Sequence, residues 1–279
     1  MALTAGIVRT DGTVARVGWT TQTPHMKLNG AGATGDGARP GAGRDQAGLS
    51  VAGARRCFWQ TVCVLAAFSV AHAFGLLGPP VVSVGLLMVA LVVIGRRQGA
   101  SVTDLGLGRA DARTGLSYGA AALGIVLVVL LLAAAVPATS GFLHDTRAEI
   151  PGRQLLYEIA VPIVLLTAVP EELAFRGVLL GSAGVLWGRW RGSLVTSALF
   201  GLWHIAPTLH TMSDNSAVSG ATASAGGRVL LVLGAVAVTF LAGLAFCWLR
   251  LRSSSLLAPV IAHAATNGLA LTVAWLAIH

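Results

Sequence analysis

The chain alternates long apolar runs with short polar segments, a pattern that predicts membrane-spanning helices. Seven runs approach the ~20 residues that a helix needs to cross a bilayer. They lie at about 57–77, from the Gly78-Pro79-Pro80 turn to Ile94, and at 116–136, 154–180, 193–209, 229–249 and 256–278. The fourth run is long and contains Pro162 and Pro170, so it can also be divided in two, which would make eight spans.

Composition supports this interpretation. Hydrophobic residues make up 55% of the chain and charged residues 11%, and the mean hydropathy is +0.76. These values are typical of an all-α, polytopic transmembrane bundle. Residues 1–54 are rich in Gly, Ala and Thr and contain no long apolar run, so we expect a disordered cytoplasmic tail. The chain then divides into this tail, a region of three spans at 55–153 and a core of four spans at 154–279.

Basic residues outnumber acidic ones by 19 to 11. Most of them flank the apolar runs, as Arg96, Arg97, Arg109 and Arg113 do between the second and third runs. This is the positive-inside pattern of a membrane protein and not a nucleic-acid surface. It predicts a multi-pass protein of the cell membrane with a cytoplasmic N-terminus and the C-terminus outside.

The three cysteines argue against a disulfide framework or a zinc knuckle. Cys57, Cys63 and Cys247 all lie in or beside apolar runs, and none forms a Cys-x-x-Cys pair. We expect buried thiols that pack as small apolar side chains, with no covalent or metal-binding role.

Charges interrupt the fourth run at Glu171, Glu172 and Arg176. Each ionised group near the centre of a span costs about 2.5 to 3.5 kcal/mol unless it faces protein or water. Counted at 1.5 Å per residue from the cytoplasmic ends of their runs, Glu171 and His204 lie roughly 15 to 16 Å deep. His263 and Asn267 lie roughly 10 to 16 Å deep on the last run. We therefore expect these residues to meet in one layer.

Spacing within the runs selects helix faces. Glu172 and Arg176 are four residues apart, and so are Phe200 and His204, and His263 and Asn267. Residues at this spacing project from one side of a helix. Glu171 points about a third of a turn away from Glu172. One carboxylate can therefore face a cavity while Arg176 holds the other.

Several intramembrane chemistries do not match these residues. The histidines form no His-Glu-x-x-His motif, no Gly-x-Ser-x-Gly elbow accompanies them, and no aspartate lies within a run. A glutamate and a histidine that activate water remain, with a His/Asn pair able to stabilise an oxyanion. A structural ion pair and a proton relay in a transporter are the alternatives that the residues leave open.

Three motifs in order resemble the CAAX-protease and bacteriocin-processing (CPBP, Abi) family of intramembrane proteases, which includes the type II CAAX prenyl endopeptidases. They are Glu171-Glu172-Leu173-Ala174-Phe175-Arg176, Phe200-Gly201-Leu202-Trp203-His204 and His263-Ala264-Ala265-Thr266-Asn267. The resemblance covers about Gln154 to the C-terminus. Family members commonly have eight spans.

The resemblance implies a protease that cleaves a membrane-associated peptide or protein within the lipid bilayer. Glu171 would be the general base on a water that His204 positions, Glu172 and Arg176 would orient the site, and His263 and Asn267 would stabilise the oxyanion. The alternatives are a non-enzymatic immunity or scaffold protein of the same fold and a proton-coupled transporter. The resemblance leaves open which substrate is cleaved and whether it is prenylated.

The family has also been labelled as metalloproteases. A divalent metal such as zinc would then be held by Glu171, His204 and His263. We favour a metal-free mechanism without a cofactor, because Asn267 is a poor zinc ligand and adjacent glutamates do not share a helix face.

Overall fold

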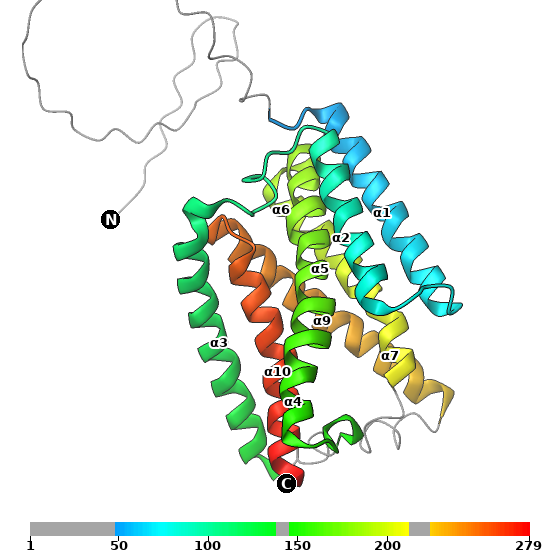
Figure 1. Cartoon of the computed structure of the whole chain (residues 1–279), viewed down its shortest axis with the longest axis vertical. Coiled ribbons are helices and arrows are strands. Elements are labelled where there is room, and N and C mark those ends of the chain that lie inside the picture. The colour runs from blue at the N-terminus through cyan, green and yellow to red at the C-terminus, as the bar shows by residue number, and fades with distance from the viewer. Residues whose placement is uncertain (1–47, 138–144, 212–223) are drawn as a thin grey trace, which may run out of the picture. The chain divides into compact units, whose positions relative to one another are not determined.

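A computed structural model describes residues 48–137, 145–211 and 224–279, which lie in one compact unit. Within these ranges the regular elements are all helices (Figure 1). The expected disordered tail falls mostly on residues 1–47, which lie outside the described residues.

The first two helices form the predicted hairpin. α1 spans Val51–Ala73 and α2 spans Pro80–Arg97. Pro79 caps α2 and Pro80 is its first residue, where a proline costs no hydrogen bond. α1 begins earlier than expected, because the Ser50 hydroxyl accepts a hydrogen bond from the Gly53 N–H at 3.1 Å. Residues 51–54 are therefore helical and do not belong to a tail.

The loop after α2 is fixed against the C-terminal helices. The Arg250 guanidinium donates to the Asp104 carbonyl at 2.8 Å, and the Leu256 N–H donates to the Gly106 carbonyl at 2.9 Å. The 3-10 turn η1 (Arg109–Asp111) then leads into α3 (Ala112–Ala135), and a second turn, η3 (Thr146–Ala148), precedes α4. α3 lies alongside α10 (Leu257–Ile278) for most of its length (Figure 1).

The predicted fourth span is one nearly continuous helical run with changing pitch. It comprises α4 (Gly152–Glu158), the π-helix η4 (Ile159–Ala168), α5 (Val169–Glu172), the π-helix η5 (Leu173–Leu179) and the start of α6 (Leu180–Trp203). Pro162 and Pro170 lack the N–H that an α-helix needs; Pro162 lies within the π-helix η4, and Pro170 lies in α5 directly after it. At Gly188 the backbone has φ 80° and ψ 163°, so the chain turns there.

The predicted fifth span is broken in the middle. α6 ends at Trp203, His204 lies at its C-terminal cap, and α7 (Ile205–Thr211) follows. α9 (Ala225–Ser253) then crosses α6 where small residues meet. A Cβ added to Gly201 would lie 2.8 Å from the Val236 carbonyl oxygen, and one added to Gly243 would lie 3.0 Å from the Ser197 Cβ. Such close crossings are characteristic of membrane helices.

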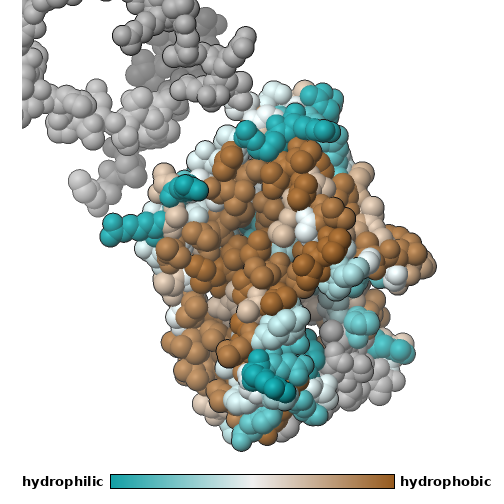
Figure 2. Space-filling view, viewed as in Figure 1, coloured by the Kyte–Doolittle hydropathy of each residue, from teal (hydrophilic) through white to brown (hydrophobic). Residues whose placement is uncertain are grey.

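Four helical segments of the described chain are long and apolar enough to cross a bilayer. They are Pro80–Arg97, Arg109–Ala135, Ala225–Ser253 and Leu257–Ile278. Figure 2 shows a broad hydrophobic surface between hydrophilic ends. The protein is thus a multi-pass helical membrane bundle, as expected. The count of seven spans stays a prediction, because α1 and the broken helices do not combine the required length with the required hydropathy.

The start of α1, the end of α2, the start of α3 and the junction of α9 with α10 lie at one end of the bundle (Figure 1). Many of the arginines lie at this end, which we name the basic end. Arg96 and Arg97 end α2, Arg109 and Arg113 begin the next segment, and Arg250 lies near the end of α9. The charge pattern of the sequence thus corresponds to one face of the bundle.

Candidate active site

A buried ion pair forms the base of the site. Arg176 Nη1 donates to Glu172 Oε1 at 2.8 Å, and the two side chains are 1% and 0% exposed. The pair spans the junction of α5 and η5, and the spacing of four residues predicted it. A buried ion pair stabilises a protein only when further partners offset the loss of hydration.

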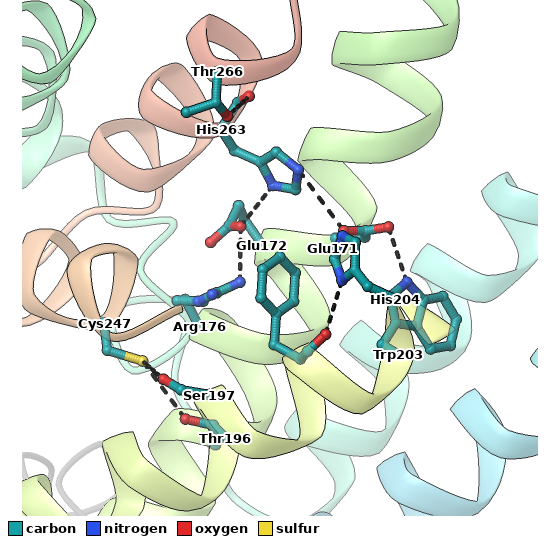
Figure 3. Close-up of polar contacts among 11 residues, drawn as sticks. Glu171, Glu172, Arg176, Thr196, Ser197, Trp203, His204, Cys247, His263 and Thr266 are labelled. Atoms are coloured by element: carbon teal, nitrogen blue, oxygen red, sulfur yellow. Dashed lines mark hydrogen bonds and ion pairs between the residues drawn. The ribbon is translucent and has the colours of Figure 1, made fainter. Parts of the chain in front are cut away.

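His263 of α10 is one such partner and connects both glutamates (Figure 3). Its Nδ1 lies 2.8 Å from Glu172 Oε1, the oxygen that Arg176 also contacts. Because a carboxylate oxygen accepts, Nδ1 carries the proton of this bond. The Nε2 atom on the other side of the ring lies 3.8 Å from Glu171 Oε2. His263 and the glutamates are brought together from α10 and α5.

Glu171 has a different environment from Glu172. Its Oε1 accepts a hydrogen bond from the Trp203 indole N–H at 2.9 Å. Its Oε2 is buried and has no hydrogen-bond partner among the described residues. A cavity of about 40 Å³ reaches Glu171 and Trp203 and is otherwise lined by apolar residues such as Phe68 and Leu87. This volume is large enough for a water molecule. Glu171 therefore borders a space that water can fill, and its Oε2 lies toward His263.

Aromatic rings surround the Arg176 guanidinium. Its central carbon lies 4.1 Å from the Phe200 ring centroid, 5.1 Å from that of Phe246 and 5.8 Å from that of Phe175. The Nε and Nη2 atoms of Arg176 have no hydrogen-bond partner in the described chain, so the ring faces replace part of the lost hydration. Phe246 also stacks on His263 at 5.4 Å. These rings hold the cation and the imidazole in place.

His204 joins the group through Phe200. Its Nδ1 lies 2.8 Å from the Phe200 carbonyl oxygen, and its ring lies 4.6 Å from the Phe200 ring. Because a carbonyl oxygen accepts, Nδ1 donates and the neutral ring keeps a lone pair on Nε2. His204 is half-buried and shares the neighbourhood of Glu171 in Figure 3.

Asn267 is placed differently from the other predicted site residues. It lies one turn beyond His263 on α10, as its spacing requires, but its side chain is exposed. The hydrogen-bonded group thus contains Glu171, Glu172, Arg176 and His263, with His204 attached through Phe200. Sequence reasoning did not identify Trp203, although its position directly before His204 and its single N–H donor were visible.

The described residues do not form a ready-made metal centre. No group of three or more His, Cys, Asp or Glu side chains in the described part of the chain could hold a metal ion. Arg176 and His263 both contact Glu172 Oε1, and Trp203 occupies Glu171 Oε1. His204 directs Nδ1 to a backbone carbonyl. Only Glu171 Oε2 and His263 Nε2 face each other as the beginning of a ligand set.

Comparison with known proteins identifies the segment that carries this site. The family model described as type II CAAX prenyl endopeptidase Rce1-like matches residues 153–269. Neither the curated proteins nor the solved structures gave a match. The matched segment includes the two glutamates, Arg176, both site histidines and Asn267. Residues 153–269, which carry the site, thus match the CAAX protease family, to which the type II CAAX prenyl endopeptidases are related.

Proposed function

We propose that the protein is an intramembrane endopeptidase that hydrolyses a peptide bond of a membrane-associated protein or peptide. The observation that carries this proposal is the hydrogen bonding of the two Glu171 carboxylate oxygens. One of these oxygens is held by Trp203, and the other is buried, has no hydrogen-bond partner among the described residues and lies 3.8 Å from His263 Nε2. A carboxylate with one oxygen free of hydrogen bonds, on a residue that borders a water-sized cavity, is suited to general-base chemistry.

In the proposed reaction Glu171 Oε2 takes a proton from water as the water oxygen bonds to the scissile carbonyl carbon. The carbonyl electrons move to its oxygen and form a tetrahedral oxyanion. The carbon–nitrogen bond then breaks, and the proton passes from Glu171 to the leaving nitrogen. His204 contributes by accepting a hydrogen bond from the water at Nε2, the nitrogen that its bond to Phe200 leaves unprotonated.

Glu172 and Arg176 act by positioning His263. Arg176 and His263 both contact Glu172 Oε1, and this acceptor keeps the proton of His263 on Nδ1. His263 then donates to the oxyanion when Nε2 also carries a proton, and Asn267, which lies one turn away on α10 with an exposed side chain, stays a proposed second donor. Donors of this kind lower the barrier most when they are held in place before the charge develops.

The test is Glu171→Gln, which keeps the size of the side chain and removes the base. We expect cleavage of membrane-proximal peptides to fall about 10²- to 10⁴-fold. The variant should still fold, insert into the membrane and accumulate. Glu149→Gln is the matched control, because Glu149 is exposed and lies outside the site.

The measurement compares membrane peptides by mass spectrometry in cells that carry wild type, Glu171→Gln or Glu149→Gln. Uncleaved membrane-associated peptides should accumulate only with Glu171→Gln. A peptide identified in this way becomes the substrate for kinetics with purified protein. Full biological activity of Glu171→Gln would overturn the proposal in favour of a scaffold role.

A further inference from the structure

Trp203 contacts Glu171 directly and lies at a position that the family motifs do not specify. It is the last residue of α6, and its half-buried indole packs edge-on against Phe175 at 6.0 Å between ring centroids. Its N–H donates to Glu171 Oε1 at 2.9 Å (Figure 3). We propose that Trp203 is a positioning residue that fixes the Glu171 carboxylate and leaves Oε2 as its reactive oxygen, a role that rests on the proposed function.

The chemistry of indole suits this role. The Nε1–H is a donor only and does not ionise near neutral pH, so Trp203 cannot act as an acid or base itself. A neutral donor also binds one carboxylate oxygen without forming an ion pair, whereas Arg176 forms an ion pair with Glu172. The adjacent glutamates are thus distinguished by their partners: one is held by charge, and the other is oriented by a neutral hydrogen bond.

The break in the helix produces this geometry. In an uninterrupted α-helix the His204 N–H would bond to the Phe200 carbonyl. The His204 N–H instead contacts the Gly201 carbonyl at 3.1 Å, and the Phe200 carbonyl accepts from the His204 side chain at 2.8 Å. The tighter final turn therefore fixes His204 while the preceding residue, Trp203, reaches Glu171. One local feature orients both the base and its histidine partner.

The sharpest test replaces only the indole N–H. 3-Benzothienylalanine has sulfur in place of that N–H and nearly the shape of Trp, and amber suppression can place it at position 203. Suppression with Trp at the same codon controls for the procedure. Trp203→Phe removes the donor and part of the ring, and Trp190→Phe is the matched control, because Trp190 is exposed.

We expect kcat for a peptide cleaved by wild type to fall about ten- to a hundredfold in both position-203 variants, the usual effect of losing a hydrogen bond to a charged group. KM should stay within about threefold, because the carboxylate acts on water rather than on substrate binding. Trp190→Phe and the suppressed Trp should match wild type. A purely packing role predicts loss in Trp203→Phe but full kcat with the benzothienyl residue, and that result overturns the proposal.

A second readout does not depend on protease activity. In protein labelled with ¹⁵N-tryptophan, the indole N–H resonance of Trp203 is assigned by its loss in Trp203→Phe. We expect it to move upfield in Glu171→Gln, because a neutral amide oxygen is a weaker acceptor than a carboxylate, while the Trp190 resonance stays in place. An unmoved Trp203 resonance would show that the hydrogen bond is absent and would overturn the inference.

The two readouts separate the two proposals. A shifted Trp203 resonance with normal kcat in the benzothienyl variant would reject the positioning role and leave the protease function intact. If wild type and Glu171→Gln have the same peptide profile, the proposed function fails, and the positioning role fails with it.

Discussion

At the scale of single residues, the site balances buried charge with few polar contacts. Glu172 Oε1 receives two donors, whereas Glu172 Oε2 and two nitrogens of Arg176 have no hydrogen-bond partner among the described residues. The aromatic rings around Arg176 compensate for part of this deficit. The cluster is consequently sensitive to the loss of either charge.

Arg176→Met tests this balance. It leaves Glu172 buried with only His263 as partner, and breaking a buried pair from one side costs about 3 to 5 kcal/mol. The double variant Glu172→Met with Arg176→Met should recover much of the loss, because no unpaired charge remains. The free energy of unfolding in detergent measures both variants, with exposed Arg153→Met as control. A loss below about 1 kcal/mol in Arg176→Met would contradict the expectation.

Whether the reaction depends on a metal is also decided by the contacts of single residues. We propose a metal-free reaction because the described residues contain no group of three or more His, Cys, Asp or Glu side chains that could hold a metal ion. Treatment with 1,10-phenanthroline should therefore leave the cleavage rate unchanged within about twofold. Loss of activity that zinc restores would reverse this expectation.

At the scale of helices, small residues set the distances between elements. α3 approaches α10 at Gly115 and Gly119, and α6 approaches α9 at Gly201 and Gly243. Each approach holds a helix of the site against a neighbouring helix, because α10 carries His263 and α6 carries Trp203. Without a hydrophobic driving force inside a bilayer, such close packing is a main source of helix association.

Gly119→Ala tests the contact between α3 and α10. The added Cβ would lie 2.6 Å from Ile261 Cδ1 and 2.9 Å from Ile261 Cβ, so the helices must separate. Overpacking of this kind costs about 1 to 3 kcal/mol. Ile261 is two residues from His263, so the cleavage rate should fall as well.

Gly124→Ala on the same helix is the control, because nothing lies within 4 Å of its added Cβ. It should be as stable as wild type or slightly more stable, since Ala favours a helix. Thermal unfolding in detergent compares the two variants. Equal melting temperatures would show that the close contact at Gly119 is unimportant.

At the scale of the whole molecule, the bundle is polarised. The junctions of α2 with α3 and of α9 with α10 lie at the basic end, whereas the C-terminus lies at the opposite end of the bundle (Figure 1). By the positive-inside rule the basic end faces the cytoplasm. We therefore predict that the C-terminus is outside.

Fusions after His279 test this orientation. Alkaline phosphatase placed there should be active and green fluorescent protein should be dark, because the first folds only outside the cytoplasm and the second is fluorescent mainly within it. The same reporters fused after Arg97, at the end of α2, should give the opposite result. A fluorescent fusion after His279 would contradict the predicted topology and imply an even number of spans.

The sequence by itself determined the features that depend on local periodicity. Hydropathy identified the helices of the described chain, the charge pattern identified the basic end, and the spacing of four residues identified the pairing of Glu172 with Arg176. These properties could be predicted because helix rise and repeat relate neighbours along the chain directly. The boundary of the tail was a few residues late because the effect of the Ser50 cap was not considered.

Only the tertiary structure decided which groups touch across helices. Depth counting placed His263 in the layer of the glutamates, but the packing of α10 against α5 determines that His263 contacts both glutamates while Asn267, one turn further along, is exposed. The break at His204 and the bond from Trp203 to Glu171 depend on how the end of α6 meets α5. Periodicity gives the height of a residue on its helix, whereas its partners depend on packing between segments far apart in the chain.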